Sequence, residues 1–217
     1  MDARNLSLTL IAFLGLTLGA TAASARIYNR VVRLGSPMPS FESLPATDGT
    51  TLSSHDLKAD VVILVFLANH CPWVRGMDGD LVRLVSHFGD RSVRLVGVSI
   101  NHRQDDRLAA MKDHAARAGY NFTYVYDESQ DLGRELGATH TPEYFVFGKD
   151  RRLAYMGLLH DSPAMMRRDG SVHYTRGRPT HFYVEDAIDA LLAGRPVKIG
   201  ETAPRGCSLE YTPTGKE

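Results

Sequence analysis

Seven consecutive apolar residues, 61–67, constrain the fold of this chain more than any other feature. The run is short, rich in β-branched side chains and without polar alternation, which predicts a strand buried on both faces. Asn69-His70-Cys71-Pro72-Trp73-Val74 follows it directly. From Val74 to Phe88 apolar residues then recur at helical spacing, so Pro72 is expected in the first turn of a helix rather than inside one.

Cys71 is thereby placed at a helix N-terminus. The unpaired N–H groups and the positive end of the helix dipole favour a thiolate there, and the thiolate is the nucleophilic form of cysteine. The sequence therefore singles out Cys71 as a candidate catalytic nucleophile.

Strand-like and helix-like segments alternate along most of the remaining chain. Thr141-Pro142 precedes one strand, where a proline is tolerated because no ladder donor is needed at a strand start. Residues 160–182 lack a clear period and are expected to form a surface loop. The other expected elements are an Asp48-Gly49 hairpin turn, strands at 93–100, 122–126, 143–147 and 153–157, a helix opened by Asp105-Asp106 and stopped at Gly119, a short helix with an Asp127-x-x-Gln130 capping box that ends at Gly137, and a last helix that ends at Gly194.

These elements predict an α/β protein with a central mixed β-sheet flanked by helices. We expect a domain at 35–194, a linker at 26–34 before it and an extended tail at 195–217 that carries Cys207.

Residues 1–25 have the pattern of a secretory signal peptide. Leu6 to Leu18 is a short apolar stretch after Arg4, and Ala23-Ser24-Ala25 matches an A-x-A cleavage site. The expected location is the periplasm or the outside of the cell. Contact with a membrane is expected only if the segment stays uncleaved as an anchor.

The charge balance gives no reason to expect a nucleic-acid partner. The chain has 25 basic and 25 acidic residues, and removal of Asp2 and Arg4 with the signal leaves 24 of each. No cofactor is expected, and the oligomeric state is open. Both cysteines would reach an oxidising compartment, where a disulfide is the default expectation.

Taken together, the motifs resemble the thioredoxin fold and, more narrowly, the bacterial redoxin or peroxiredoxin-like proteins of the alkyl hydroperoxide reductase and thiol-specific antioxidant type. The similarity spans about residues 33–210. It is carried by Gly35 to Leu52, Asn69 to Val74, Asp127 to Gln130, Thr141-Pro142-Glu143 with Phe145-Val146-Phe147, the Tyr155-Gly157 spacing, Ala187 to Gly194 and Gly206-Cys207-Ser208.

The resemblance implies that the Thr141-Pro142 bond is cis and faces the thiol of Cys71. It also implies that Pro72, Trp73, Thr141 and Pro142 border a site for an extended peptide substrate. Protein thiols, protein disulfides or a small oxidant are then the expected reaction partners, with an external thiol as reductant.

The chain departs from two patterns of the proteins that it resembles. Val74 stands where thioredoxin-like enzymes carry the second cysteine of Cys-x-x-Cys, so Cys207 is the only internal candidate for a resolving thiol. Ala68 and Leu64 stand where peroxiredoxins carry threonine and proline, which makes ordinary peroxidase activity doubtful.

Several alternatives remain open from the sequence. Cys71 and Cys207 form a redox-active bridge, a static bridge or two unpaired thiols. His70 and His140 are candidates for tuning the ionisation of the thiol, or else are exposed polar residues. A Cys-His metal centre is disfavoured because adjacent His70 and Cys71 are poor chelating partners.

The leading hypothesis is an exported thiol–disulfide oxidoreductase that uses Cys71 and Cys207. The other hypotheses are a non-catalytic peptide-binding module and an atypical thiol peroxidase with an antioxidant role.

Overall fold

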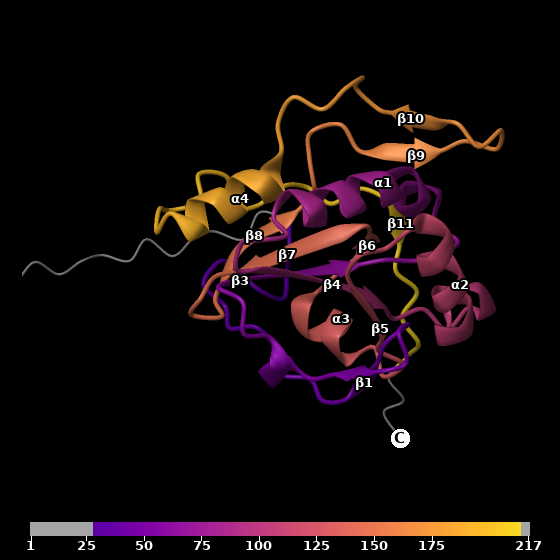
Figure 1. Ribbon diagram of the computed structural model, residues 1–217, viewed down its shortest axis with the longest axis horizontal. Coiled ribbons are helices and arrows are strands. Elements are labelled where there is room, and N and C mark those ends of the chain that lie inside the picture. Colours follow the sequence, from indigo (N-terminus) through magenta and orange to yellow (C-terminus); the bar gives the residue numbers. More distant parts are fainter. Residues whose placement is uncertain (1–27, 214–217) are drawn as a thin grey trace, which may run out of the picture.

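A five-stranded mixed sheet forms the centre of the molecule in the computed structural model, which describes residues 28–213 (Figure 1). The strand order is β5-β4-β3-β7-β8, with β3 parallel to β4 and antiparallel to β7. The predicted mixed sheet is therefore confirmed, whereas the predicted signal peptide lies outside the described residues. The strands are β3 (Val61–Phe66), β4 (Val93–Ser99), β5 (Thr123–Tyr126), β7 (Glu143–Phe147) and β8 (Leu153–Gly157).

Strand β3 is buried on both faces because its side chains alternate between two hydrophobic cores. Ile63 and Val65 face the core that contains Leu81 of α1 and Ile188 of α4. Leu64 belongs to the opposite core, to which α3 contributes. Helices on both sides thus explain why the run at 61–67 has no polar alternation. The helices are α1 (Pro72–His87), α2 (Leu108–Ala118), α3 (Asp131–Leu136) and α4 (Tyr183–Leu192).

The helix boundaries mostly follow the predicted signals. Pro72 is the first residue of α1, and α2 and α3 end at Gly119 and Gly137, which adopt left-handed φ values of 68° and 63°. The predicted hairpin turn at Asp48-Gly49 joins β1 (Leu44–Pro45) to β2 (Thr51–Leu52).

Two predicted helix starts are wrong in their detail. Asp106 lies in a short 3₁₀ turn (Gln104–Asp106), and α2 begins only at Leu108. The capping box at residues 127–130 is only half formed. Asp127 Oδ1 accepts the Gln130 N–H (3.1 Å), but the N–H of Asp127 bonds to the Ser99 carbonyl, and the side-chain amide of Gln130 is engaged elsewhere.

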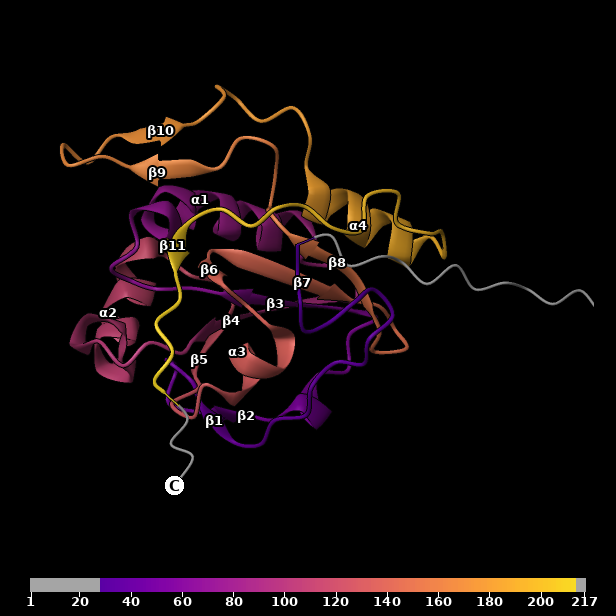
Figure 2. The same cartoon turned by 180° about the vertical axis from the view of Figure 1, so that it is seen from behind.

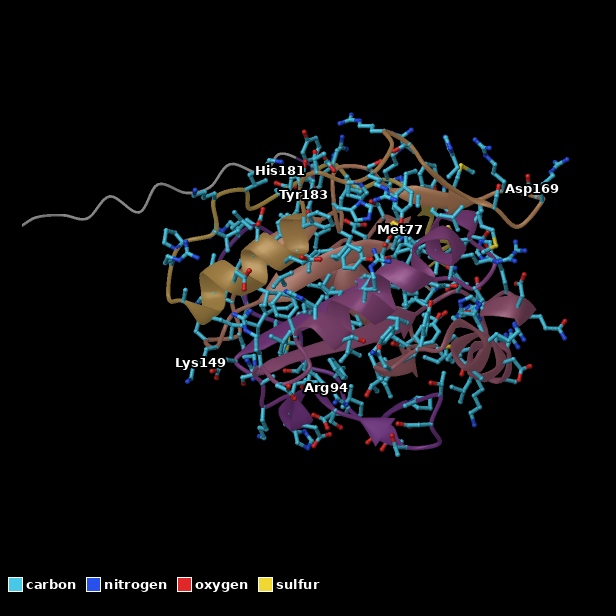
Figure 3. All side chains as sticks on the ribbon, turned by 45° about the horizontal axis from the view of Figure 1, so that its top comes forward. Met77, Arg94, Lys149, Asp169, His181 and Tyr183 are labelled. Carbon is cyan, nitrogen blue, oxygen red and sulfur yellow. The ribbon has the colours of Figure 1, made fainter. Side chains whose placement is uncertain are left out.

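The predicted surface loop at 160–182 is also wrong. It contains a hairpin of β9 (Ala164–Met166) and β10 (Val172–Tyr174) that lies over α1 (Figures 1 and 2). The hydroxyl of Tyr174 donates to the buried carboxylate of Asp80, with distances of 3.1 and 3.2 Å to its two oxygens. Asp169 marks the tip of the hairpin, which extends away from the body (Figure 3).

Beyond α4, the tail runs in extended form across the molecule towards α3 (Figure 2). Glu201 bridges to Met156 of β8 in parallel orientation. Further on, β11 (Cys207–Ser208) pairs antiparallel with β6 (His140–Thr141). Within residues 28–213, no helix combines the length and the apolar character needed to cross a bilayer.

Candidate active site

Cys71 joins the end of β3 to the start of α1, as predicted. It is the N-cap residue of α1, with φ −74° and ψ 119°, and its carbonyl accepts the Arg75 N–H at 3.0 Å. Its side chain, however, is 0% exposed. Other parts of the chain cover the sulfur in this conformation.

One of these parts is the Thr141-Pro142 segment, whose peptide bond is cis, as the resemblance implies. The sulfur of Cys71 donates to the carbonyl oxygen of Thr141 at 3.3 Å. Thr141 and Pro142 thus flank the thiol at the point where β6 leads into β7.

The other part is the tail, which brings Cys207 to the same place. The two sulfurs are 2.7 Å apart, and both cysteines are free thiols in this structure. Cys207 lies opposite Thr141 in the β11–β6 pair, and Ser208 lies opposite His140. Sequence reasoning named Cys207 as a resolving candidate, and the structure brings it into direct contact with Cys71.

Burial raises the pKa of Cys207 to about 12, and its hydrogen bond with Cys71 and the charge of Cys71 act in the same direction. A hydrogen bond from the backbone N–H of Trp73 opposes this rise in pKa. Cys207 therefore keeps its proton at neutral pH.

Trp73 is covered by the same tail. The guanidinium of Arg205 lies over its ring, 5.3 Å from the centroid. A cation over the face of tryptophan is attracted by the ring, so this contact helps to hold the tail against the start of α1.

His70 is held by a buried carboxylate. Its Nδ1 lies 2.5 Å from Asp106 Oδ2, and its backbone N–H donates to Asp106 Oδ1 at 3.2 Å. The side-chain amide of Asn101 donates to the same carboxylate at 3.0 Å. Asp106 thus orients the imidazole next to Cys71 and assigns the donor role to Nδ1.

Sequence reasoning missed Asp106 and Asn101 as site residues. It interpreted Asp106 as a helix opener, and no local pattern connects residue 106 with residue 70. Only the parallel pairing of β3 and β4 brings their ends together.

The hydrogen bonds of His140 go to Thr139 and Glu143 and not to either thiol. Its Nδ1 lies 2.8 Å from the hydroxyl of Thr139, and burial lowers the pKa of its imidazole. A neutral imidazole is therefore favoured at this edge, beside the tail.

One group of side chains within residues 28–213 has the composition of a metal site. His70, Asp105 and Asp106 offer ligand atoms within 4.8 Å of one another, and neither cysteine belongs to the group. The hydrogen bonds of Asp106 to His70 and Asn101 already account for this cluster, so we assign no ion to it.

Comparison with known proteins agrees with this geometry. The family model described as Redoxin matches residues 33–170. The chain belongs to the Redoxin family. It is a thioredoxin-like redox protein whose sheet, helix-start cysteine and cis proline are arranged as the resemblance implies. No curated protein is recognisably similar to it.

Two solved structures resemble this redoxin over most of its length. An uncharacterized conserved protein from Geobacillus kaustophilus is 30% identical, with 87% of this chain and 97% of that chain covered and a TM-score of 0.74. A hypothetical protein from Sinorhizobium meliloti is 24% identical, with 88% and 100% covered and a TM-score of 0.74.

A third solved structure shows the fold alone. The thioredoxin domain of a thiol-disulfide oxidoreductase from Bacteroides vulgatus is 20% identical, with 58% of this chain and 89% of that chain covered and a TM-score of 0.51.

Proposed function

We propose that this redoxin is a thiol–disulfide oxidoreductase in which Cys71 is the nucleophile and Cys207 is the resolving thiol. The observation that carries the proposal is the 2.7 Å contact between the two sulfurs, across a β pair that aligns Cys207 with Thr141. A cysteine that was close to Cys71 without taking part in the reaction would not need to pair with the strand beside the cis proline.

The reaction divides into two exchange steps. The thiolate of Cys71 attacks one sulfur of a disulfide, and the other sulfur leaves as a thiolate that takes up a proton. Cys207 then loses its proton and attacks the Cys71 sulfur of the mixed disulfide. The second substrate thiolate leaves, and the protein holds a Cys71–Cys207 disulfide. Two external thiols, or one dithiol, then reduce the Cys71–Cys207 bond through a second mixed disulfide. They leave as a disulfide, and both cysteines return to the thiol form.

The imidazole of His70 is suited to accept or return the proton near Cys71, because Asp106 holds Nδ1 and leaves Nε2 available. Thr141, Pro142, Pro72 and Trp73 border the site and would contact the substrate. Protein thiols or disulfides are the substrate class we expect, which agrees with the thiol-disulfide oxidoreductase of Bacteroides vulgatus that shares the fold.

We further propose that the protein is exported and works as a redoxin domain at 35–194 with a functional tail at 195–217. The sequence pattern of residues 1–25 supports export to the periplasm or beyond. An oxidising compartment would supply the disulfides that the reaction needs.

The test compares Cys71→Ser and Cys207→Ser with the native protein in reduction of a model protein disulfide by an external dithiol. Cys71→Ser should abolish turnover, whereas Cys207→Ser should accumulate a mixed disulfide with Cys71 that mass spectrometry detects. Unchanged turnover in Cys71→Ser would refute the mechanism. Consumption of peroxide by the same proteins, with the same dependence on Cys71, would instead favour a peroxidase.

A further inference from the structure

Two buried amide side chains hold the backbone of the tail just beyond Cys207. They are Gln130 and Asn101, both 0% exposed. Neither belongs to the tail, and neither is hydrogen-bonded to a sulfur. Their position suggests that they set where the tail, and therefore Cys207, lies.

Gln130 has every polar atom of its side chain engaged. Its Nε2 donates to the carbonyls of Ile100 (2.8 Å) and Glu210 (2.9 Å). Its Oε1 accepts the backbone N–H of Thr212 (2.8 Å) and the Thr212 hydroxyl (2.9 Å). A buried amide with all its partners in place gives a well-defined geometry, and three of these bonds go to the tail.

The backbone at Gln130 is unusual for this residue type. Its φ of 66° lies in the left-handed region, where residues other than glycine are uncommon. This conformation occurs at the N-cap of α3, and the amide that a capping box would have used is engaged with the tail instead.

Asn101 also binds the backbone of the tail, at Glu210. Its Oδ1 accepts the N–H of Glu210 at 3.2 Å, while its Nδ2 donates to Asp106 Oδ2. The N–H and the carbonyl of Glu210 are therefore both bound by buried amides, as a neighbouring strand would bind them. Asn101 thus connects the tail at Glu210 to the carboxylate of Asp106, which orients His70.

The tail is anchored on the other side of Cys207 as well. The N–H of Thr202 donates to the Met156 carbonyl at 3.1 Å, and its hydroxyl accepts the N–H of Leu158 at 2.9 Å. Cys207 thus lies in a segment fixed at both ends. Because the segment is fixed at both ends, Cys207 stays close to Cys71. The effective concentration of the Cys207 thiol at the Cys71 sulfur is therefore high.

We propose that Gln130 is a positioning residue for the resolving thiol, which acts by latching the tail at Glu210 and Thr212. The inference rests on the proposed function, in which Cys207 closes a disulfide with Cys71. Loss of the latch would leave both thiols chemically intact but would let Cys207 spend less time beside Cys71.

The test uses an aromatic disulfide that releases one coloured thiolate at each of two steps. In the first step a protein thiolate attacks the reagent, which forms a mixed disulfide and releases one thiolate. In the second step the other cysteine attacks the protein sulfur of that mixed disulfide, forms the Cys71–Cys207 bond and releases the second thiolate. The second step is unimolecular, so its rate reports how well the two cysteines are held together.

Gln130→Met keeps the size of the side chain and removes the amide. We expect the first release not to be slowed and the second to slow by about tenfold, because the three hydrogen bonds from Gln130 to the tail are lost. Ser129→Ala is the matched control, because Ser129 lies in the same loop and bonds only to Asp127 and Asp131. In this variant the rate of forming the Cys71–Cys207 disulfide should equal that of the native protein.

Thr212→Pro removes the N–H that Gln130 binds, from a position in the exposed tail that cannot unfold the core. It should slow closure as Gln130→Met does. Closure within twofold of the native rate in both variants would overturn the latch. Release of only one thiolate by the native protein would instead overturn the resolving role of Cys207, and the latch with it.

Discussion

Cys207 lies directly opposite Thr141 in an antiparallel pair at the edge of β6. The chain's own tail thus occupies the edge beside the cis Thr141-Pro142 bond, where an extended peptide substrate is expected to pair. Two strands cannot pair with the same edge at once, because each backbone group there has one ladder partner. A protein substrate that used this edge would therefore have to displace the tail.

The approach of the tail to Thr141 depends on Gly206. A Cβ added at this residue would lie 2.0 Å from the Thr141 carbonyl oxygen, far inside contact distance. We predict that Gly206→Ala pushes the tail away from β6 and slows closure of the Cys71–Cys207 disulfide by tenfold or more. The two-step thiolate release described above measures this rate.

Gly79→Ala is the control for Gly206→Ala, because a Cβ at residue 79 would meet only the end of the Arg83 side chain, at 3.9 Å. Its closure rate should match that of the native protein. Native closure in Gly206→Ala would mean that the tail docks without the close contact at Thr141.

The pKa of Cys207 offers a test of the contact between the two thiols. Burial, the hydrogen bond with Cys71 and the charge of Cys71 together raise it to about 12. Cys71→Ala removes the last two causes. It leaves burial and the charge of Asp106, which raise the pKa, and the hydrogen bond from the Trp73 N–H, which lowers it. The pKa of the remaining thiol should therefore fall below 12 and stay above its ordinary value.

Absorbance of the thiolate at alkaline pH follows this titration, and circular dichroism shows whether the fold persists over the same range. Ser129→Ala serves as a control in which both thiols and the contacts of the tail remain. A midpoint for Cys207 in Cys71→Ala that equals the native one would show that Cys71 does not contribute.

The sequence predicts the parts of this site that depend on neighbouring residues. The apolar run at 61–67 identifies the buried strand, and Cys71-Pro72 at its end identifies the helix start, because both signals act over a few residues. The Thr141-Pro142 pair is likewise a local signal. These three features already place a thiol between the end of a buried strand and the start of a helix.

The parts that the sequence does not predict depend on contacts between distant segments. Gln130 fits a capping box by its spacing, but the amide binds a backbone 80 residues further along the chain. Asp106 fits a helix start, yet it bonds to His70. In both cases a polar side chain has a local partner and a distant partner, and only the packed structure decides between them.

Glu143 carries a buried carboxyl group directly after the cis proline. Burial raises its pKa, although the backbone N–H groups of Thr139 and His140 donate to its Oε2 at 2.7 and 3.0 Å. A raised folded-state pKa means that the protonated carboxyl favours folding, and this contribution is lost as the pH rises through that pKa. At neutral pH the charge therefore opposes folding.

Glu143→Gln keeps an acceptor oxygen for the two N–H groups and removes the charge. We predict a free energy of unfolding at pH 7 at least equal to that of the native protein, with an advantage that shrinks as the pH is lowered. Glu143→Ala should instead cost about 1–3 kcal/mol, because it leaves buried donors without an acceptor. Denaturant unfolding at several pH values measures both variants. The prediction would be contradicted if Glu143→Gln, compared with the native protein, were less stable at pH 7 than at acid pH.

Asp80 should anchor the β9–β10 hairpin to α1. Its burial opposes ionisation, but the hydrogen bond from His160 and the charge of Arg83 prevail and lower its pKa. A lowered folded-state pKa stabilises the fold above the unfolded-state pKa, and this is lost as the pH falls. Tyr174 of β10 donates to the same carboxylate.

Asp80→Asn should lower the free energy of unfolding by about 2–3 kcal/mol at pH 7, since it weakens a buried, charge-assisted cluster. The difference from the native protein should shrink at acid pH. Trypsin should also cut faster at Arg167 and Arg168, which are exposed on the hairpin. Asp113→Asn, an exposed change on α2, should leave both the stability and the cleavage rate unchanged. Equal cleavage of Asp80→Asn and the native protein would show that Asp80 does not anchor the hairpin, because an unanchored hairpin would open to the protease more often.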